Sequence, residues 1–393
     1  MLKNLKRRRA QLYARGELAE AKEYDFFPVS FEMPKQDYAL FVEEFKQSGG
    51  IWVMKPSGSA EGKGIFLFTD LSEVKAWAKP HLVRQMKRSD TEPPSLLALS
   101  HQNMDAVPNF PAQYVRCRWC RSSNGTFLSS SSRDPGNPGS YVVQRYISSP
   151  FVIGGKKFDL RLYVLVTSFR PLTVYIYRDG FAKFSSTRFR QVRHADPAHL
   201  ANELMHLTNH AVQRRGAAVG KKWSLKKFKL HVAMRHGRRA MDKLFWDIQA
   251  LVVRTIRAVD RLIIQDRQSF ELFGYDVLVD ENLRPWLLEV NASPSLGASN
   301  RDDLHLKKQM VGDVLDIVDV EGRQETTFFE NAADKLALVV PAGSCVREHV
   351  GGFDLAFHNG HVELQPQVCG YSTLFGAVVR NPVKHSLRAK KDK

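Results

Sequence analysis

A chain of 393 residues with 43% hydrophobic and 25% charged residues is ordinary for a soluble globular protein of two or three domains with a sizeable core. The 58 Lys and Arg residues exceed the 41 Asp and Glu residues, and the net charge of +17 favours a polyanionic partner such as nucleic acid, an acidic protein tail or anionic lipid. Four cysteines argue against a disulfide framework and for a reducing compartment, and the lack of a run of about 18 apolar residues or of an apolar signal core argues against membrane insertion and secretion.

The first 50 residues are predicted to be a helical and linker segment. Residues 2–23 are basic and then mixed in charge, and on their own they indicate a solvated helix. We therefore expect three parts: this segment (1–50), a core (51–318) and a loop-rich basic tail (319–393).

A glycine-rich segment between two short apolar runs predicts a β-hairpin whose tip can fold over a ligand. Residues 51–54 and 65–68 are apolar runs too short for helices. The intervening SGSAEGKG is not a P-loop, because only three residues separate Gly58 from Gly62, and glycine follows Lys63 in place of Ser or Thr. Glycines in such a loop let backbone N–H groups approach phosphate oxygens closely.

Residues 79–140 lack the sustained periodicity of a helix or a strand. The segment contains PP, NFP and SSSSRDPGNPG, and a stretch of this composition cannot bury enough apolar surface to form a core. It predicts a disordered insertion into the core. Cys117 and Cys120 form a lone C-x-x-C there, and Cys345 and Cys369 are too far apart to complete a zinc site.

Order returns at residue 141 with two predicted strands, YVVQRYI and KFDLRLYVLVTSF. Because side chains alternate along a strand, Lys157, Asp159 and Arg161 share one face of the second strand, opposite an apolar row. Such a charged face either binds something charged or lies open to water.

Three features precede the central part of the chain. Residues 172–177 and 181–184 predict a second hairpin. The segment 214–239 is densely basic, which indicates either a solvated face or a docking surface for an acidic polymer. Residues 240–264 predict a long helix, because apolar residues recur at helical spacing along one stripe that faces the core.

The stretch GYDVLVDENLRPWLLEVNASPS, residues 274–295, predicts a hairpin at the centre of the candidate site. A four-residue connection places Asp276 directly opposite Glu289, with Cβ atoms about 5 Å apart, and alternation puts Leu287, Glu289 and Asn291 on one face. The two carboxylates would repel, so we expect a cation between them. Together with the Asn291 amide oxygen they form a hard oxygen set that suits Mg²⁺ held with phosphates. The alternative is a surface hairpin with solvated acids.

Residues 302–318 predict the last helix. From residue 319 the chain is weakly patterned, and KHSLRAKKDK at its end is predicted to be a disordered basic segment.

Seven motifs in this order resemble the tubulin tyrosine ligase-like family of ATP-grasp amino-acid ligases: WVMKP, EGKGIF, QRYI, KFDLRLYVLV, HLTN, GYD and LLEVNASPS. They cover residues 3–315 apart from the insertion, and VGGFDLAFHNG near the end resembles the tail of the ninth member type of the polyglutamylase branch. The resemblance implies an α+β, ATP-grasp fold in which two lobes close on ATP. It also implies that the family's N-terminal domain is largely missing before residues 1–50.

Matching the motifs residue by residue implies a nucleotide site. The implied ATP-binding residues are Lys55, Glu61, Gly62, Gln144, Arg145, Tyr146, Ile147, Lys157, Phe158, Asp159, Thr208 and Asn209. Of these, Lys55 and Lys157 would contact the phosphates. The family usually carries glutamine at the position of Glu61, and an acid near phosphate could weaken ATP binding.

The resemblance also implies the metal, catalytic and substrate-binding residues. Asp276, Glu289 and Asn291 would hold Mg²⁺, with Glu289 also catalytic, and Arg161 would stabilise the acyl phosphate. The implied substrate-binding residues are Lys183, Lys222 and Lys307. At Lys183 the family usually carries an arginine for the carboxylate of the incoming amino acid, and lysine keeps the charge but loses the two-pronged geometry.

The implied reaction is ATP-dependent addition of glutamate to glutamate side chains in the acidic C-terminal tails of tubulin, through an acyl phosphate. Tubulin or microtubules and free glutamate would be the partners, no membrane is expected, nucleic acid is disfavoured, and the need for accessory subunits stays open. The implied location is the cytoplasm and cytoskeleton, with the cilium or flagellum and basal body as specific sites. The alternatives are a catalytically impaired microtubule- or RNA-binding protein and a ligase that adds another amino acid, such as glycine.

Overall fold

The computed structural model describes residues 1–33, 37–57, 62, 64–74, 141–191, 197–213, 222–264, 269–319 and 347–358. It divides the chain into two compact units, a smaller one of residues 30–146 and a larger one of residues 1–29 with those from 147 onward. The sequence predicted a first boundary at residue 50 instead. Residues 30–33 belong to the smaller unit because they form a strand that pairs with residues 141–144. The predicted insertion at 79–140 lies outside the described residues.

The smaller unit contains a four-stranded antiparallel sheet in the order β1-β4-β2-β3. Its elements are β1 (Ser30–Met33), α3 (Tyr38–Ser48), β2 (Trp52–Pro56), β3 (Phe66–Phe68) and β4 (Tyr141–Arg145). The predicted glycine-rich hairpin is confirmed, since β2 pairs with β3 and Met54 lies opposite Phe66. In the connection, Gly62 and Gly64 both have φ of 75°, a left-handed conformation that favours glycine.

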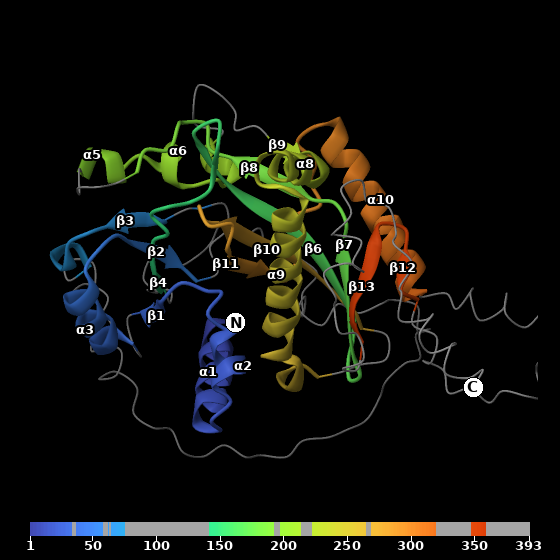
Figure 1. Ribbon diagram of the computed structural model, residues 1–393, viewed down its shortest axis with the longest axis horizontal. Helices are drawn as coiled ribbons and strands as arrows, with labels where there is room; N and C mark the ends of the chain where they lie inside the picture. The colour runs from blue at the N-terminus through green and yellow to red at the C-terminus, as the bar shows by residue number, and fades with distance from the viewer. Residues whose placement is uncertain are drawn as a thin grey trace, which may run out of the picture. The chain divides into compact units, whose positions relative to one another are not determined.

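The larger unit is built on a nine-stranded sheet whose main path runs β11-β10-β6-β7-β13-β12, as Figure 1 shows for the strands behind helix α9. Off this path, β5 and β8 pair with β6, and β9 pairs with β8. The strands are β5 (Val152–Ile153), β6 (Lys156–Phe169), β7 (Leu172–Tyr177), β8 (Phe181–Phe184), β9 (Lys222–Ser224), β10 (Glu271–Val279), β11 (Pro285–Asn291), β12 (His349–Val350) and β13 (Phe353–His358).

Alternation along β6 decides what covers each face of the sheet. The apolar row that starts at Phe158 packs in the main core with helix α9 (Arg238–Arg257), as predicted. On the other face, Tyr163 and Leu165 pack in a second cluster with helix α10 (Arg301–Val318). The charged residues at 157, 159 and 161 precede them on that same face. The strand therefore carries charge at one end and apolar side chains under α10 at the other.

The long helix predicted over 240–264 begins two residues earlier, at Arg238, and also ends earlier. The predicted helix over 240–264 ends at Arg257, because the Val259 amide bonds to the carbonyl of Ile256, three residues back, and the chain tightens into the 3₁₀ helix η1 (Asp260–Leu262). Further helices in the described part of the chain include α1 (Leu2–Ala14), α2 (Leu18–Lys22), α5 (Pro197–Leu200), α6 (Glu203–His206), α7 (His210–Gln213) and α8 (Leu225–His236). None of the described helices is both long and apolar enough to cross a bilayer.

The two ends of the described chain belong to the body of the larger unit. Leu5 and Leu12 of α1 are buried in the same core as α9, so this helix is solvated on one side only. In the segment that the sequence predicted to be loop-rich, β12 and β13 form a hairpin that joins the sheet at the edge of β7. Phe353 of β13 is fully buried (0% exposed) beside α10.

Candidate functional site

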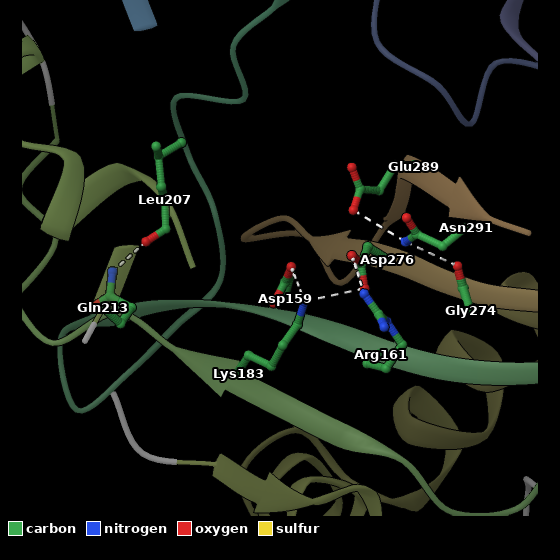
Figure 2. Close-up of polar contacts among 9 residues, drawn as sticks. All are labelled: Asp159, Arg161, Lys183, Leu207, Gln213, Gly274, Asp276, Glu289 and Asn291. Carbon is green, nitrogen blue, oxygen red and sulfur yellow. Dashed lines mark hydrogen bonds and ion pairs between the residues drawn. The ribbon is translucent and has the colours of Figure 1, made fainter. Parts of the chain in front are cut away.

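Four neighbouring strands bring charged side chains into one row across the larger sheet. Asp159 on β6 lies opposite Lys183 on β8. Two positions along β6, Arg161 lies opposite Asp276 on β10, which in turn lies opposite Glu289 on β11. Figure 2 shows these side chains on one face of the sheet. The candidate catalytic and metal-binding residues predicted from separate motifs are therefore brought together.

The hairpin of β10 and β11 confirms the predicted pairing of Asp276 with Glu289, but by a different route. Val279 pairs with Pro285, so the connection is one residue longer than predicted, and a bulge between Asp276 and Val277 restores the register. Because Leu287 pairs with Val277, its side chain lies in the core, whereas Glu289 lies on the charged face. The prediction that Leu287 and Glu289 share a face was wrong, since the bulge reverses the alternation.

Asp276 is buried, with 2% of its surface exposed, and is held by two cations of the protein itself. Arg161 donates from Nε to Oδ1 (2.6 Å) and from Nη2 to Oδ2 (2.8 Å), and Lys183 Nζ donates to Oδ1 (3.2 Å). Burial alone would raise the pKa of this carboxyl, but Lys183 and Arg161 together hold it well below its usual range. Asp276 is therefore ionised at neutral pH.

Asp159 is the second carboxylate bound by Lys183, whose Nζ lies 3.1 Å from its Oδ2. Asp159 is 4% exposed, and its Oδ1 has no hydrogen-bond partner among the described residues. Burial raises the pKa of Asp159, against the opposing effect of Lys183. Burial would lower the pKa of Lys183, but Asp159 and Asp276 raise it, so the lysine stays charged. Lys183, predicted to bind substrate, is paired with both carboxylates here.

The oxygen donors of the hairpin fit a hard divalent cation. Asn291 uses its amide nitrogen to donate to Glu289 Oε1 (3.2 Å) and to Gly274 O (3.4 Å), which leaves its amide oxygen to act as a ligand. Two carboxylates and one amide oxygen on paired strands are a donor set suited to Mg²⁺. Within the described part of the chain, no three His, Cys, Asp or Glu side chains form a cluster that could hold a metal ion.

At the start of β6, Lys157 joins the strand to the loop after α6. Its side chain is buried, and Nζ donates to the carbonyl of His206 (2.9 Å). Thr208, which is buried, and Asn209 follow in that loop, so this group of predicted nucleotide-binding residues lies together. Phe158 differs, because its side chain is fully buried on the opposite face of β6, and only its backbone could contact a ligand.

Gln213 was not predicted from the sequence. Its side chain forms hydrogen bonds that hold the loop carrying Thr208 and Asn209. Its Nε2 donates to the carbonyls of Leu204 (3.2 Å) and Leu207, and its Oε1 accepts from the amide of Ser186 (2.6 Å). Figure 2 shows the contact between Gln213 and Leu207. A polar residue inside a short helix carries no sequence signal for this role.

Two predicted substrate-binding lysines, Lys222 of β9 and Lys307 of α10, converge on one carboxylate. Asp303 of α10 is fully buried (0% exposed), and its Oδ2 accepts from Lys222 Nζ (2.9 Å) while Oδ1 lies 3.1 Å from Lys307 Nζ. Burial would raise the pKa of Asp303, but the Ser299 amide and both lysines lower it to about 2. Lys222 lies directly opposite Lys183 in the pairing of β9 with β8.

Three of the remaining predicted nucleotide-binding residues, Lys55, Gln144 and Arg145, lie on β2 and β4 of the smaller unit. Lys55 Nζ donates to Gln144 Oε1 (2.6 Å), and Gln144 Nε2 donates to Ser30 Oγ (3.1 Å). The Arg145 guanidinium lies 5.3 Å from the centre of the Trp52 ring. Burial raises the pKa of Tyr146, the last residue of the smaller unit. Ile147 belongs to the larger unit, which the chain re-enters at this residue. Glu61, predicted at the tip of the covering loop, lies outside the described residues, whereas Gly62 is described.

The sequence of this chain is similar to those of a known protein family. The sequence pattern of the family described as "Tubulin-tyrosine ligase family" matches residues 1–327. The chain is 38% identical over 377 residues to "Probable tubulin polyglutamylase TTLL9" of Rattus norvegicus, covering 95% of this chain and 72% of the relative. It is 40% identical over 367 residues to the Bos taurus protein of the same name (92% and 70%), and 35% identical over 299 residues to "Probable alpha-tubulin polyglutamylase Ttll1" of Tetrahymena thermophila (75% and 60%).

Proposed function

The chain belongs to the tubulin-tyrosine ligase family, and on this premise we propose that it is an ATP-dependent tubulin polyglutamylase. Its mixture of helices and antiparallel sheets is the ATP-grasp-like domain of that family, and as a member it is a ligase that forms carbon–nitrogen bonds. The proposed substrates are a glutamate side chain in a tubulin tail and free glutamate, joined at the expense of ATP.

The proposed reaction has two steps. In the first, an oxygen of the tail carboxylate attacks the γ-phosphorus of ATP, the bond to the β-phosphate oxygen breaks, and an acyl phosphate and ADP are formed. In the second, the amino group of free glutamate attacks the acyl carbon, the carbon–oxygen bond to phosphate breaks, and the amine releases its proton. No covalent intermediate with the protein is needed, so charged residues that position and stabilise the reactants suffice.

The observation that carries the proposal is the ionised Asp276 facing Glu289 across β10 and β11, with Arg161 beside it. Asp276, Glu289 and Asn291 would hold Mg²⁺, which when bound supplies positive charge next to the transferring phosphoryl group. Arg161 engages Asp276 through Nε and Nη2, and Nη1 is then the donor for an oxygen of the acyl phosphate.

The nucleotide and the amino acid have separate proposed contacts. In the larger unit, the proposed ATP contacts are Lys157 and the loop of Thr208 and Asn209. In the smaller unit, they are Lys55 and Gln144. Lys183 is the proposed partner for the carboxylate of the incoming amino acid, and it would then exchange part of its pairing with Asp159 and Asp276 for the substrate.

We place the docking of the acidic tubulin tail on the exposed side of α8, which we call the α8 face. It consists of Lys226, Lys227, Leu230, Met234 and Arg235. Met234 is 80% exposed and Leu230 39%, so apolar surface lies among the cationic side chains. A mixed basic and apolar surface complements a tail of carboxylates on a folded protein better than a purely charged face does, because it combines attraction with burial of apolar area.

The proposed cellular location follows from tubulin as the proposed substrate. We expect the protein in the cytoplasm on the microtubule cytoskeleton, with the cilium or flagellum and basal body as specific sites, and without a membrane or nucleic-acid partner. Imaging of the tagged protein beside a microtubule marker tests this, and separate purification with and without co-expressed candidate subunits tests whether accessory subunits are needed.

The proposed function is tested by incubating the chain with tubulin, ATP, Mg²⁺ and labelled glutamate, beside the variants Glu289→Gln and Glu281→Gln. Both substitutions make the same chemical change, but Glu281 lies exposed in the turn of the hairpin. We expect Glu281→Gln to match the wild type and Glu289→Gln to lose at least about 100-fold in rate, as expected when a ligand of a catalytic ion is removed. Equal activity of the two variants would remove Glu289 from the mechanism.

The same assay separates the alternatives. Incorporation of labelled glycine in place of glutamate would identify a different ligase. Microtubule binding without incorporation of any label would identify a binding protein. The pairing of Asp276 with Arg161 and Lys183 is the feature that such a protein would retain.

A further inference from the structure

We propose that Asp303 is a positioning residue that holds Lys222 and Lys307 in place to receive one carboxylate of the incoming glutamate. The inference rests on the proposed function and assigns a role to a residue that none of the sequence motifs includes. It comes from the position of Asp303 at the start of α10, where it is fully buried between two lysines from different elements.

Each lysine contacts Asp303 and further groups beside it. Lys222 Nζ donates to Asp303 Oδ2 (2.9 Å) and to Ser299 Oγ (2.7 Å), and it lies 5.2 Å from the centre of the Phe181 ring. Lys307 Nζ lies near Asp303 Oδ1 and donates to the carbonyl of Gly297. Without the carboxylate, two ammonium groups would face each other in a poorly hydrated site and would repel.

The group of Lys222, Asp303 and Lys307 carries one unbalanced positive charge. One carboxylate neutralises one of the two lysines, and the side chains of Lys222 and Lys307 keep 18% and 8% of their surface exposed. An uncompensated cation in a partly buried site favours an anion, and the proposed substrate supplies carboxylates. Lys222 lies opposite Lys183, so the group is continuous with the candidate ligase site.

Asp303 could instead serve to cap the start of α10. Substitutions can distinguish this capping role from the positioning of Lys222 and Lys307. Asp303 Oδ2 accepts from the amide (2.9 Å) and Oγ (3.0 Å) of Ser299, and the side chain of Asn300, the residue that caps α10, accepts from the Asp303 amide (2.8 Å). An asparagine at 303 can still accept from Ser299 but cannot neutralise a lysine. Asn300→Ala removes the cap and leaves the carboxylate with its lysines.

The test compares Asp303→Asn with Asp302→Asn and Asn300→Ala in the full chain. Asp302 is the adjacent exposed acid of the same first turn, so it controls for the loss of one charge near the helix start. We expect Asp303→Asn to raise KM for glutamate about 10-fold or more, with KM for ATP changed by less than about 2-fold. Asp302→Asn should match the wild type, and Asn300→Ala should lower the melting temperature without changing KM for glutamate.

A second measurement does not depend on ligase activity. Acylation of lysines by acetic anhydride, followed site by site with mass spectrometry, should be at least about 3-fold faster at Lys222 and Lys307 in Asp303→Asn than in the wild type, because an amine that its carboxylate partner no longer holds is more accessible to the reagent. Lys308, which is exposed next to Lys307, should be acylated at the same rate in both.

The outcomes distinguish this inference from the proposed function. A wild-type chain without ligase activity overturns the proposed function, and the glutamate-binding role of Asp303 falls with it. A wild type that is active while Asp303→Asn keeps its KM for glutamate overturns the positioning role alone. Unchanged acylation of Lys222 and Lys307 would also overturn it, because the carboxylate would then not control the lysines.

Discussion

His206 is a buried base at the entrance to the loop that carries Thr208 and Asn209. Its Nε2 lies 3.0 Å from the His199 carbonyl, and burial lowers the pKa of the ring from 6.5 to about 4. The unfolded chain therefore binds a proton at higher pH than the folded chain does, and the free energy of unfolding falls as the pH drops from 6.5 towards 4. This stabilising contribution is complete above the unfolded pKa.

We predict that His206→Gln reduces this pH dependence. Glutamine does not titrate, and its amide can still donate to His199. Between about pH 7 and pH 5, the wild type should lose at least about 1 kcal/mol more unfolding free energy than the variant, since one pKa unit corresponds to about 1.4 kcal/mol. Urea denaturation at a series of pH values measures the difference, and identical slopes for the two proteins would contradict the assignment.

Gln213 is the residue whose loss should disturb the nucleotide loop without touching a proposed ligand. In Gln213→Glu, an acceptor replaces the amide that donates to the Leu204 and Leu207 carbonyls, so the carboxylate would face two carbonyl oxygens. We expect a loss of about 1–3 kcal/mol in stability and a higher KM for ATP. Gln191→Glu, at an exposed position, is the control and should stay within about 0.5 kcal/mol. Equal behaviour of the two variants would show that Gln213 does not support the loop.

At the scale of elements, the hairpin of β12 and β13 is joined to α10 through a glycine turn. The Gly352 amide donates to Asp313 Oδ2 (2.8 Å), and Arg178, the residue after β7, donates from Nη2 to Asp354 Oδ1 (2.6 Å). Gly351 has φ of 51°, and a Cβ added there would lie 1.9 Å from Asp313 Oδ1. The hairpin, α10 and β7 therefore depend on one another for their positions.

Two glycine-to-alanine substitutions should have opposite effects on this arrangement. Gly351→Ala should destabilise the protein by at least about 1–2 kcal/mol, because the left-handed backbone is strained by a side chain and Asp313 must move. Gly312→Ala, inside α10 with nothing within 4 Å of the new Cβ, should stabilise by up to about 1 kcal/mol. Thermal unfolding measures both, and shifts in the same direction would contradict the proposed coupling.

Local patterns in the sequence predicted the elements whose partners are close in the chain. Alternation along β6 predicted its apolar and charged faces, and the polar turn after Val279 predicted the hairpin that pairs Asp276 with Glu289. The bulge at Leu288 gave no signal, because an additional apolar residue among apolar residues does not alter the pattern. β13 was missed for another reason, since a short strand in a weakly patterned tail is stabilised by an edge strand far away in sequence.

In the candidate site, too, contacts between residues that are distant in sequence could not be predicted. Asp303 resembles any acid in the first turn of a helix, and the residue that reveals its role, Lys222, lies 81 positions away. The family resemblance identified Lys222 and Lys307 separately, and only the fold shows that both contact one carboxylate. The role of Gln213 likewise depends on contacts between segments that are separate in the sequence. The same holds for Asp159, whose Oδ1 has no hydrogen-bond partner among the residues that the structure describes.

At the scale of the whole molecule, the net charge of +17 can act on an acidic partner in two ways. A diffuse positive field accelerates encounters with any polyanion, and it is screened over about 8 Å at physiological salt. A defined surface adds contacts that depend on particular side chains and on apolar burial. The α8 face is such a defined surface, because the exposed apolar residues Met234 and Leu230 lie among its cationic side chains.

Charge reversal at matched positions separates the two contributions. Lys226→Glu with Arg235→Glu and Arg15→Glu with Lys46→Glu change the net charge equally, but only the first pair lies on the α8 face, and all four residues are exposed. In co-sedimentation with microtubules at low salt, we expect the α8 pair to weaken binding about 10-fold or more and the control pair by less than about 3-fold. Proteolytic removal of the tubulin tails should abolish the difference between the pairs, since the carboxylates that distinguish them are then gone. An equal loss in both pairs would mean that the overall field alone attracts the tail, and the α8 face would lose its assignment even if the ligase reaction were demonstrated.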